Sequence, residues 1–207
     1  MADTPEDAKP PAAPPPSQPA PPASAAPPAP PPKPPVPKID PVEAALRAEG
    51  SSPALDLLRE KHPEAIVDVT WHAGAVSVVV PGAMLIEILR FLHDDPRAAF
   101  TMLTDQTAVD WPKRDKRFDV VYHLYSIPNN QRLRLKLRVG EGESVPSATA
   151  LFASADWFER EIFDLFGVRF DGHPDLRRIM MPDEWQGHPL RKEFPLEGLP
   201  EQHMRLR

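Results

Sequence analysis

The most regular pattern in the chain lies between residues 132 and 139, where apolar and cationic residues alternate. The apolar residues are Leu133, Leu135, Leu137 and Val139, and the cationic residues are Arg132, Arg134, Lys136 and Arg138. Because successive side chains of a β-strand point to opposite faces of a sheet, the pattern predicts a strand with one core face and one cationic face. Two interpretations of the cationic face stay open: a solvated outer face, or a surface that meets an acidic partner protein or nucleic acid.

Other stretches predict the strands that accompany this one. Residues 65–71 and 76–80 are expected to form a hairpin with a tight turn at Ala73-Gly74. Residues 100–111 are expected to be extended, and residues 118–127 to form a strand after the charged turn at 113–117. A turn at 128–130, Pro-Asn-Asn, then leads into the alternating strand.

Helical spacing occurs ahead of and between these strands. Asp40-Pro41 and Ser52-Pro53 each predict the start of a short helix, the first of which runs through Leu46. A further helix is predicted by five apolar residues that share one face: Met84, Leu85, Ile88, Leu89 and Leu92. Together these elements predict an α+β fold, a mainly antiparallel sheet packed with helices.

A charged amphipathic helix is predicted from residue 156 to residue 166. Ser154 or Asp156 can cap its start, Asp156 and Glu159 have the spacing of a capping box, and Gly167 ends it. Arg160 and Asp164 are spaced to pair across one turn. The apolar face consists of Phe158, Ile162, Leu165 and Phe166. Its charged residues Glu159, Arg160, Glu161 and Asp164 fit either a solvated helix face or a protein interface.

Proline and glycine interrupt the chain at short intervals after Gly167, which leaves little room for regular structure. The apolar residues among these breaks would lie in water if the segment were disordered. We therefore predict that residues 172–207 form an extended C-terminal arm that docks on another protein, since aromatic residues and arginine dominate interfaces. The candidate interface residues in the arm are His173, Arg177, Arg178, Asp183, Trp185, His188, Arg191 and Lys192.

The start of the chain has a different composition from the rest. Residues 1–38 are nearly all proline and alanine, which predicts a disordered tail without enough apolar surface to fold. A proline-rich ligand for an adaptor domain is the alternative interpretation of this tail. Three segments result: the tail at 1–38, an α+β domain at 39–171, and the docking arm at 172–207.

Charge and cysteine content narrow the functional classes. A net charge of −6 and a pI near 5.6 argue against a dedicated nucleic-acid binder. The chain has no cysteine, so it has no disulfide and no thiolate for an iron–sulfur cluster. No apolar run has the roughly 18 to 20 residues of a membrane span, and no signal peptide is evident, which predicts a cytoplasmic protein.

A metal-dependent hydrolase is the main alternative from a different functional class. His173 and His188, with Asp175 or Asp183, have suitable ligand chemistry for zinc or iron. Their spacing matches no compact helical metal motif, and each histidine lies in a Gly-His-Pro turn where a backbone hydrogen bond is an equally good use of the ring. There is no glycine-rich phosphate loop and no nucleophile elbow.

Residues 155–196 read ADWFEREIFDLFGVRFDGHPDLRRIMMPDEWQGHPLRKEFPL. This segment closely resembles the signature of the C subunit of bacterial NADH-quinone oxidoreductase, the thirty-kilodalton subunit family of respiratory complex I. The shared features are ERE, DLFG, GHPDLRR, the acidic-Trp step and GHPLRK, in this order. Residues 40–151 resemble the family's N-terminal domain more loosely, and the tail lies outside the resemblance.

The resemblance implies a cofactor-free subunit of the peripheral arm, without an active site of its own, docked on the large subunit that shapes the quinone pocket. The complex passes electrons from NADH through FMN and iron–sulfur clusters, held by partner subunits, to a quinone, and it couples this to proton pumping. The chain would then be a hetero-oligomer component on the cytoplasmic side of the bacterial inner membrane, attached only through the complex. Related subunits serve membrane-bound hydrogenases, which stays open as an alternative.

Overall fold

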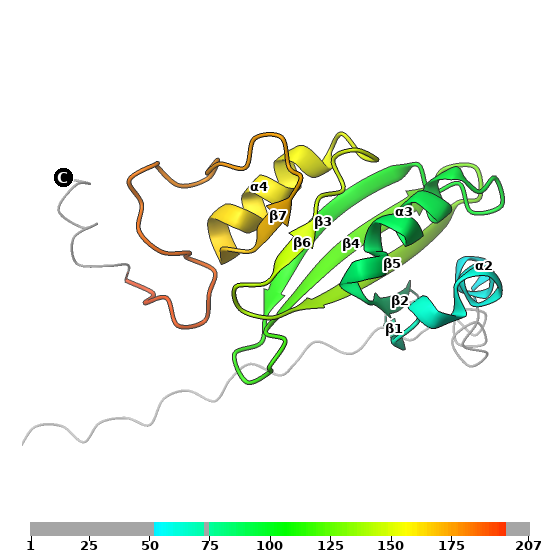
Figure 1. Cartoon of the computed structure of the whole chain (residues 1–207), viewed down its shortest axis with the longest axis horizontal. Coiled ribbons are helices and arrows are strands. Elements are labelled where there is room, and N and C mark those ends of the chain that lie inside the picture. Colours follow the sequence, from blue (N-terminus) through cyan, green and yellow to red (C-terminus); the bar gives the residue numbers. More distant parts are fainter. Residues whose placement is uncertain (1–51, 73–74, 198–207) are drawn as a thin grey trace, which may run out of the picture. The chain divides into compact units, whose positions relative to one another are not determined.

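The computed structural model describes residues 52–72 and 75–197, and the helices and strands follow in the order shown in Figure 1. The predicted tail at 1–38, the helix expected from Asp40 and the turn at 73–74 lie outside the described residues. The helices are α2 (Pro53–Lys61), α3 (Leu85–Asp94) and α4 (Ala155–Phe166), with 3-10 turns at Pro63–Ala65 and Gly82–Met84. The strands are β1 (Asp68–His72), β2 (Ala75–Val80), β3 (Met102–Asp110), β4 (Phe118–Ser126), β5 (Gln131–Val139), β6 (Ser144–Pro146) and β7 (Arg169–Asp171).

The main sheet has five strands in the order β1-β2-β5-β4-β3. The pairs β1–β2, β4–β5 and β3–β4 are antiparallel, and β2–β5 is the parallel pair. The α+β class and the mainly antiparallel sheet are therefore confirmed. The hairpin is also confirmed, but its first strand begins at Asp68 and not at Ala65, because Pro63 starts a 3-10 turn that includes Ala65.

The core lies between the sheet and its helices. In α3 the side chains of Leu85, Ile88, Leu89 and Leu92 are fully buried, as the helical spacing predicts. Leu133, Leu135 and the other apolar residues of β5 are buried in the same cluster. Burying each side chain of this size stabilises the fold by about 1.5 to 3 kcal/mol. Helix α2 begins as predicted, with the Leu55 amide donating to Ser52 Oγ at 3.1 Å.

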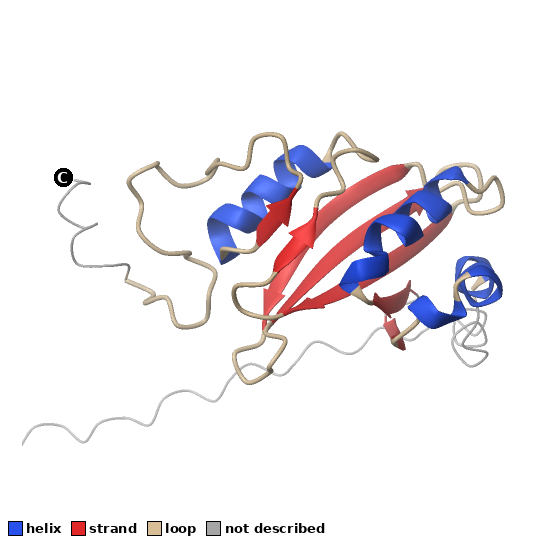
Figure 2. Cartoon of the chain, viewed as in Figure 1, coloured by secondary structure: helices blue, strands red, loops and turns tan. Residues whose placement is uncertain are grey.

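A second, two-stranded sheet forms where the sequence predicted almost no regular structure. Strand β7 pairs in parallel with β6, placing Val145 opposite Phe170, and both side chains are buried. Each strand has three residues, which is too short for an alternation to be recognised in the sequence. Figure 2 shows the described part of the C-terminal arm that follows β7 entirely as loop.

Helix α4 begins differently from the prediction. The Ser154 hydroxyl donates to the Leu103 carbonyl of β3 and makes no capping bond to α4. The predicted capping box between Asp156 and Glu159 is wrong, because Glu159 is buried and accepts from residues 147 and 148. Long-range contacts to β3 and to the 147–148 segment therefore take the place of local capping at this helix.

Candidate partner interface

Asp164 of α4 is the main attachment point of the C-terminal arm. Its carboxylate is fully buried, and Oδ2 accepts three backbone N–H donors in a row, from Ile179 at 3.1 Å and from Met180 and Met181 at 2.8 Å each. The guanidinium of Arg178 donates to Oδ1 at 2.5 Å. Burial acts to raise the pKa of Asp164, but these hydrogen bonds outweigh burial and hold the pKa below its ordinary value.

This geometry corrects the predicted pairing within α4. Arg160 does not pair with Asp164; its guanidinium meets Asp156 at 2.8 Å, one turn earlier, and Asp175 of the arm at 3.5 Å. The cation that binds Asp164 is Arg178, which lies fourteen residues after Asp164 in the chain. The prediction failed because i,i+4 spacing allows a pair but does not decide between it and a tertiary partner.

The far end of the arm is held by a second buried carboxylate, Asp110 at the end of β3. Arg117 binds Asp110 through two bonds of 2.7 Å, and the Lys192 backbone N–H donates to the same carboxylate at 2.8 Å. Arg117 also pairs with Glu193 of the arm. Asp110 and Arg117 were not among the predicted site residues, although opposite charges just before and at the end of the 113–117 turn were a visible signal.

The middle of the arm lies against the C-terminal end of α4. The His188 ring donates from Nδ1 to the Asp164 carbonyl at 2.8 Å, and Arg191 donates from Nε to the Phe166 carbonyl at 2.7 Å. The Leu190 amide donates to the Leu165 carbonyl at 3.0 Å. The arm therefore supplies donors to the last carbonyls of α4, which have no partner within the helix.

Gly167 allows this close approach. It ends α4 in the left-handed region, with φ at 78°. A Cβ at this position would lie 2.6 Å from the His188 ring and 2.8 Å from an Arg191 nitrogen. Both the backbone conformation and the packing therefore require glycine here.

Glu159 lies inside the domain, between α4 and the segment before it. Its carboxylate is fully buried and accepts from the Ser147 hydroxyl and the Ala148 amide, each at 2.7 Å. Burial raises the pKa of Glu159 above its ordinary value, and the two hydrogen bonds oppose the rise only in part. The charged side of α4 is therefore no solvated face, since Glu159, Arg160 and Asp164 are all buried and only Glu161 is exposed.

The two histidines proposed as metal ligands serve separate structural roles. The His173 ring lies 3.1 Å from the Asp156 carbonyl through Nε2, and its Nδ1 accepts from the Asp175 amide at 3.0 Å. The His188 ring binds the carbonyl of a different residue, Asp164. Within residues 52–72 and 75–197, no three His, Cys, Asp or Glu side chains are grouped to hold a metal ion.

The predicted interface residues divide into two groups by the direction in which they point. The inward group consists of Glu159, Arg160, Asp164, His173, Arg178, Trp185, His188 and Arg191, which are buried or half-buried. The outward group consists of Glu161, Arg177, Asp183 and Lys192, which are exposed. Large apolar side chains are exposed beside the outward group: Trp157 on α4 is 62% exposed, and Met180 and Leu190 on the arm are 55% and 49% exposed.

The inner side of the arm thus carries its buried charged groups together with Leu176 and Met181, which pack on the core, and its outer side is partly apolar. Within the arm, the rings of Trp185 and Phe194 stack with their centroids 6.3 Å apart. Figure 1 shows the arm curving around one end of α4. This arrangement uses the charged groups to attach the arm to its own domain and leaves apolar side chains available for a partner.

A family model described as respiratory-chain NADH dehydrogenase, 30 kDa subunit, matches residues 78–200, more than half of the chain. The chain belongs to this family. The match includes the main sheet from β2 onward, α4 and the described arm.

Several curated members of the thirty-kilodalton subunit family are close relatives. The C subunit of NADH-quinone oxidoreductase from Citrifermentans bemidjiense is 51% identical over 142 residues, which cover 68% of this chain and 87% of that protein. The corresponding C subunit from Brucella ovis is 49% identical over 144 residues, covering 70% and 71%. A C subunit from Rhizobium meliloti is 46% identical over 154 residues, covering 74% and 77%.

Two solved structures have a similar fold. A trypsin-resistant fragment of Nqo5 is 32% identical with a TM-score of 0.52, and the match covers 59% of this chain and 99% of the fragment. A chain of a membrane-bound sulfane sulfur reductase, an archaeal respiratory complex, is 25% identical with a TM-score of 0.59, covering 69% and 84%.

Proposed function

We propose that this chain is a cofactor-free peripheral-arm subunit of the proton-pumping NADH-quinone oxidoreductase, and that it docks through its C-terminal arm on the large quinone-site subunit. Support comes from curated relatives about half identical to this chain, each named as the C subunit of that enzyme. The complex transfers electrons from NADH through FMN and iron–sulfur clusters to quinone. In this proposal partner subunits hold those cofactors, and this chain has no cysteine with which to ligate a cluster.

The division of the arm into two sides is the observation that carries the docking proposal. Two buried carboxylates, Asp164 and Asp110, fix the inner side through backbone amides and arginines. Fixing the backbone before assembly lowers the ordering cost of binding. The exposed side chains of Met180 and Leu190 then provide apolar area of the kind that is buried at the centre of stable interfaces.

The proposal also assigns a location. No helix among the described residues is long and apolar enough to cross a bilayer. From the relatives named as subunits of the same enzyme, we propose that the chain lies on the cytoplasmic side of the bacterial inner membrane, held there by its partner subunits.

A second candidate is the equivalent subunit of a related membrane-bound complex. It is favoured by the match to the sulfane sulfur reductase chain, which covers 84% of that chain. The two candidates differ in their partners and not in the fold of this subunit.

Isolation of the tagged chain under mild detergent, with identification of the co-purified subunits by mass spectrometry, tests both candidates. We expect the large quinone-site subunit and the FMN-bearing subunits together, with NADH-to-quinone activity in the eluate. Recovery of hydrogenase or sulfur-reductase subunits would favour the second candidate. Recovery of the chain alone would contradict both, and stoichiometric metal in that sample would favour the hydrolase alternative.

A further inference from the structure

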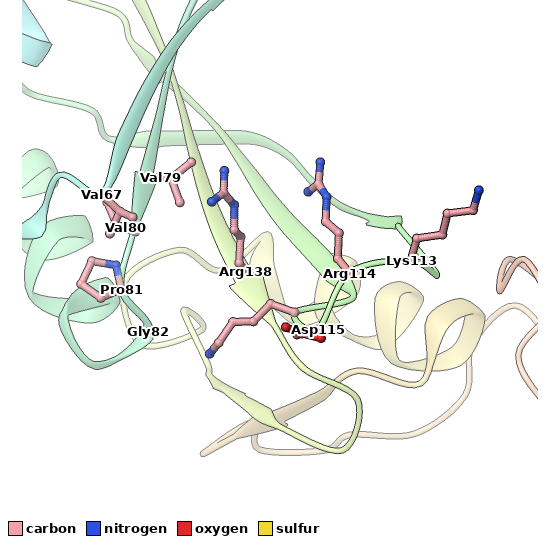
Figure 3. A pocket seen from close by; sticks show the side chains of 10 residues that line it. Val67, Val79, Val80, Pro81, Gly82, Lys113, Arg114, Asp115 and Arg138 are labelled. Carbon is pink, nitrogen blue, oxygen red and sulfur yellow. The ribbon is translucent and has the colours of Figure 1, made fainter.

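A hollow of about 800 Å³ lies beside the 113–116 loop, at one end of the main sheet (Figure 3). Its lining comes from the residue before β1, from β2 with the turn after it, from the 113–116 loop, and from β5. The lining residues are Val67, Val79, Val80, Pro81, Gly82, Lys113, Arg114, Asp115, Lys116 and Arg138. No residue of the arm is among them, so the hollow is separate from the surface proposed above.

Positive charge predominates in this lining, with four cations and one carboxylate. Figure 3 shows the side chains of Arg114 and Arg138 projecting in the same direction, with Lys113 beyond them. The ten lining residues together carry a charge of +3, four cations less Asp115, whereas the whole chain carries −6. A local charge of this kind attracts and orients an anionic partner.

Three of the hollow's cations already pair with carboxylates, and two of these pairs are exposed. The third, Arg114, is held at 3.2 Å by Asp119, which is buried. Arg138 pairs with Asp68 at 3.2 Å and Lys116 pairs with Glu143 at 3.2 Å, and all four side chains are largely exposed. Exposed ion pairs contribute only about 0 to 1 kcal/mol, so their exchange for another carboxylate costs little. Lys113 makes no ion pair with any described residue.

The cationic face of β5 extends this positive region across the sheet. Lys136 lies opposite Val79 of β2 and Val121 of β4, and it makes no ion pair within the described part of the chain. Burial lowers the pKa of the neighbouring His123, and the charges of Arg134 and Lys136 lower it further. The histidine is therefore neutral at pH 7, and the positive charge of the face comes from arginine and lysine, which do not titrate near neutral pH.

The floor of the hollow is apolar. Val67 is 59% exposed beside Pro81, while Val79 and Val80 form a buried base. Inorganic phosphate has no apolar group that could contact such a floor, so the floor would not contribute to its affinity. The lining has no aromatic residue on which a nucleic-acid base could stack, and the apolar base is recessed, so it cannot insert into a bilayer.

We propose that this hollow, with the adjoining cationic face of β5, is a docking site for an acidic polypeptide segment of a partner protein, in which carboxylates meet Lys113, Lys136 and Arg138 and a small apolar side chain rests on Val67 and Pro81. Of the two interpretations of the cationic face of β5, this proposal adopts a surface that binds an acidic partner protein. The proposal does not depend on the arm, and it holds whichever respiratory complex contains the chain.

Fluorescence anisotropy with the full chain tests the proposal, using a labelled ten-residue peptide of alternating glutamate and valine as the probe. The site variant is Lys113→Glu with Lys136→Glu. The control is Lys61→Glu with Arg90→Glu, which makes the same change of net charge at exposed positions of α2 and α3. We expect the site variant to weaken peptide binding about tenfold or more and the control to change it about twofold or less.

Two further measurements distinguish the contribution of the apolar floor from that of the charges, and binding of a polypeptide from binding of other anions. Val67→Ser should weaken binding of the glutamate–valine peptide several-fold without affecting a peptide of glutamate and glycine. Equal loss in the control variant, or no saturable binding below about 1 mM, would overturn the proposal. Tighter binding of phosphatidylglycerol vesicles or of a ten-nucleotide DNA strand than of the peptide would also overturn it.

Discussion

At the scale of single residues, the buried acids of α4 perform structural tasks that their sequence pattern does not reveal. Asp164 holds the arm through three backbone amides and Arg178, while Glu159 holds the segment at 147–148. Both acids lie in the segment that carries the family resemblance. The concentration of charged residues in this helix suggested either a solvated face or a protein interface. A charged residue identifies a strong hydrogen-bonding group, but only the tertiary fold decides its partner.

Asp164→Asn should loosen the arm more than the domain. An amide cannot offer two acceptor oxygens, so either the three backbone N–H groups or Arg178 would lose its partner. Breaking a buried ion pair costs about 3 to 5 kcal/mol, and we expect the arm's attachment to weaken by about this amount. Amide hydrogen exchange at residues 179–181 measures it directly.

The control for Asp164→Asn is Arg177→Gln, which removes an exposed ion pair with Asp175. Exchange at residues 179–181 should remain as in the natural chain, because exposed pairs contribute little. Unchanged protection of these amides in Asp164→Asn would show that Asp164 does not hold the arm.

Glu159→Gln should be tolerated and should change the pH dependence of stability. The folded pKa of Glu159 is raised, so its contribution to stability is present below the ordinary pKa of 4.5 and is lost as pH rises through the folded pKa. Relative to the natural chain, the glutamine variant should therefore gain stability as pH rises from 4.5 to 8. Urea denaturation across this range is the measurement, and a constant difference between the two proteins would contradict the assignment.

Glu159→Ala serves as the matched variant for the hydrogen bonds of Glu159. It leaves the buried Ala148 N–H without its acceptor, which costs about 1 to 3 kcal/mol at any pH. A loss in the glutamine variant as large as in the alanine variant would indicate that the charge itself stabilises the fold.

At the scale of elements, most helices and strands of the domain could be predicted, while the short ones could not. The alternation in β5 and the helical face of α3 are long enough to specify both type and buried face. Strands β6 and β7 have three residues each and depend on each other for hydrogen bonds. The capping of α4 and the pairing of Arg160 failed for a related reason: local spacing competes with contacts far along the chain.

Gly167→Ala should detach the arm from the end of α4. Alanine in the left-handed region costs about 1 kcal/mol, and its Cβ would collide with His188 and Arg191. The arm should become a substrate for limited proteolysis while the domain stays folded. Gly142→Ala is the control, since its φ is 79° but a Cβ there meets nothing within 4 Å; equal cleavage in both variants would assign the effect to backbone strain alone.

At the scale of the whole molecule, the family could be inferred from the C-terminal signature, but the internal design of the arm could not. A docking arm was expected from its apolar and aromatic residues, and the inward-pointing charges of Arg178 and Arg191 were expected to serve the partner. Both arginines bind groups of this chain, so substituting them would disturb the arm itself. The strand order and the parallel β2–β5 pair were also beyond the sequence, because non-consecutive strands pair through contacts that no local pattern encodes.

The most direct test of the docking proposal is the amount of large quinone-site subunit that co-purifies with tagged variants of this chain. Met180→Asp with Leu190→Asp places charge on the outer side of the arm, and Ile127→Asp places charge at an apolar residue of the β4–β5 turn that is equally exposed. We expect the double arm variant to lose most of the large subunit while the chain stays folded by circular dichroism, and the turn variant to retain it. Full recovery of the large subunit by the arm variant would contradict docking through the arm.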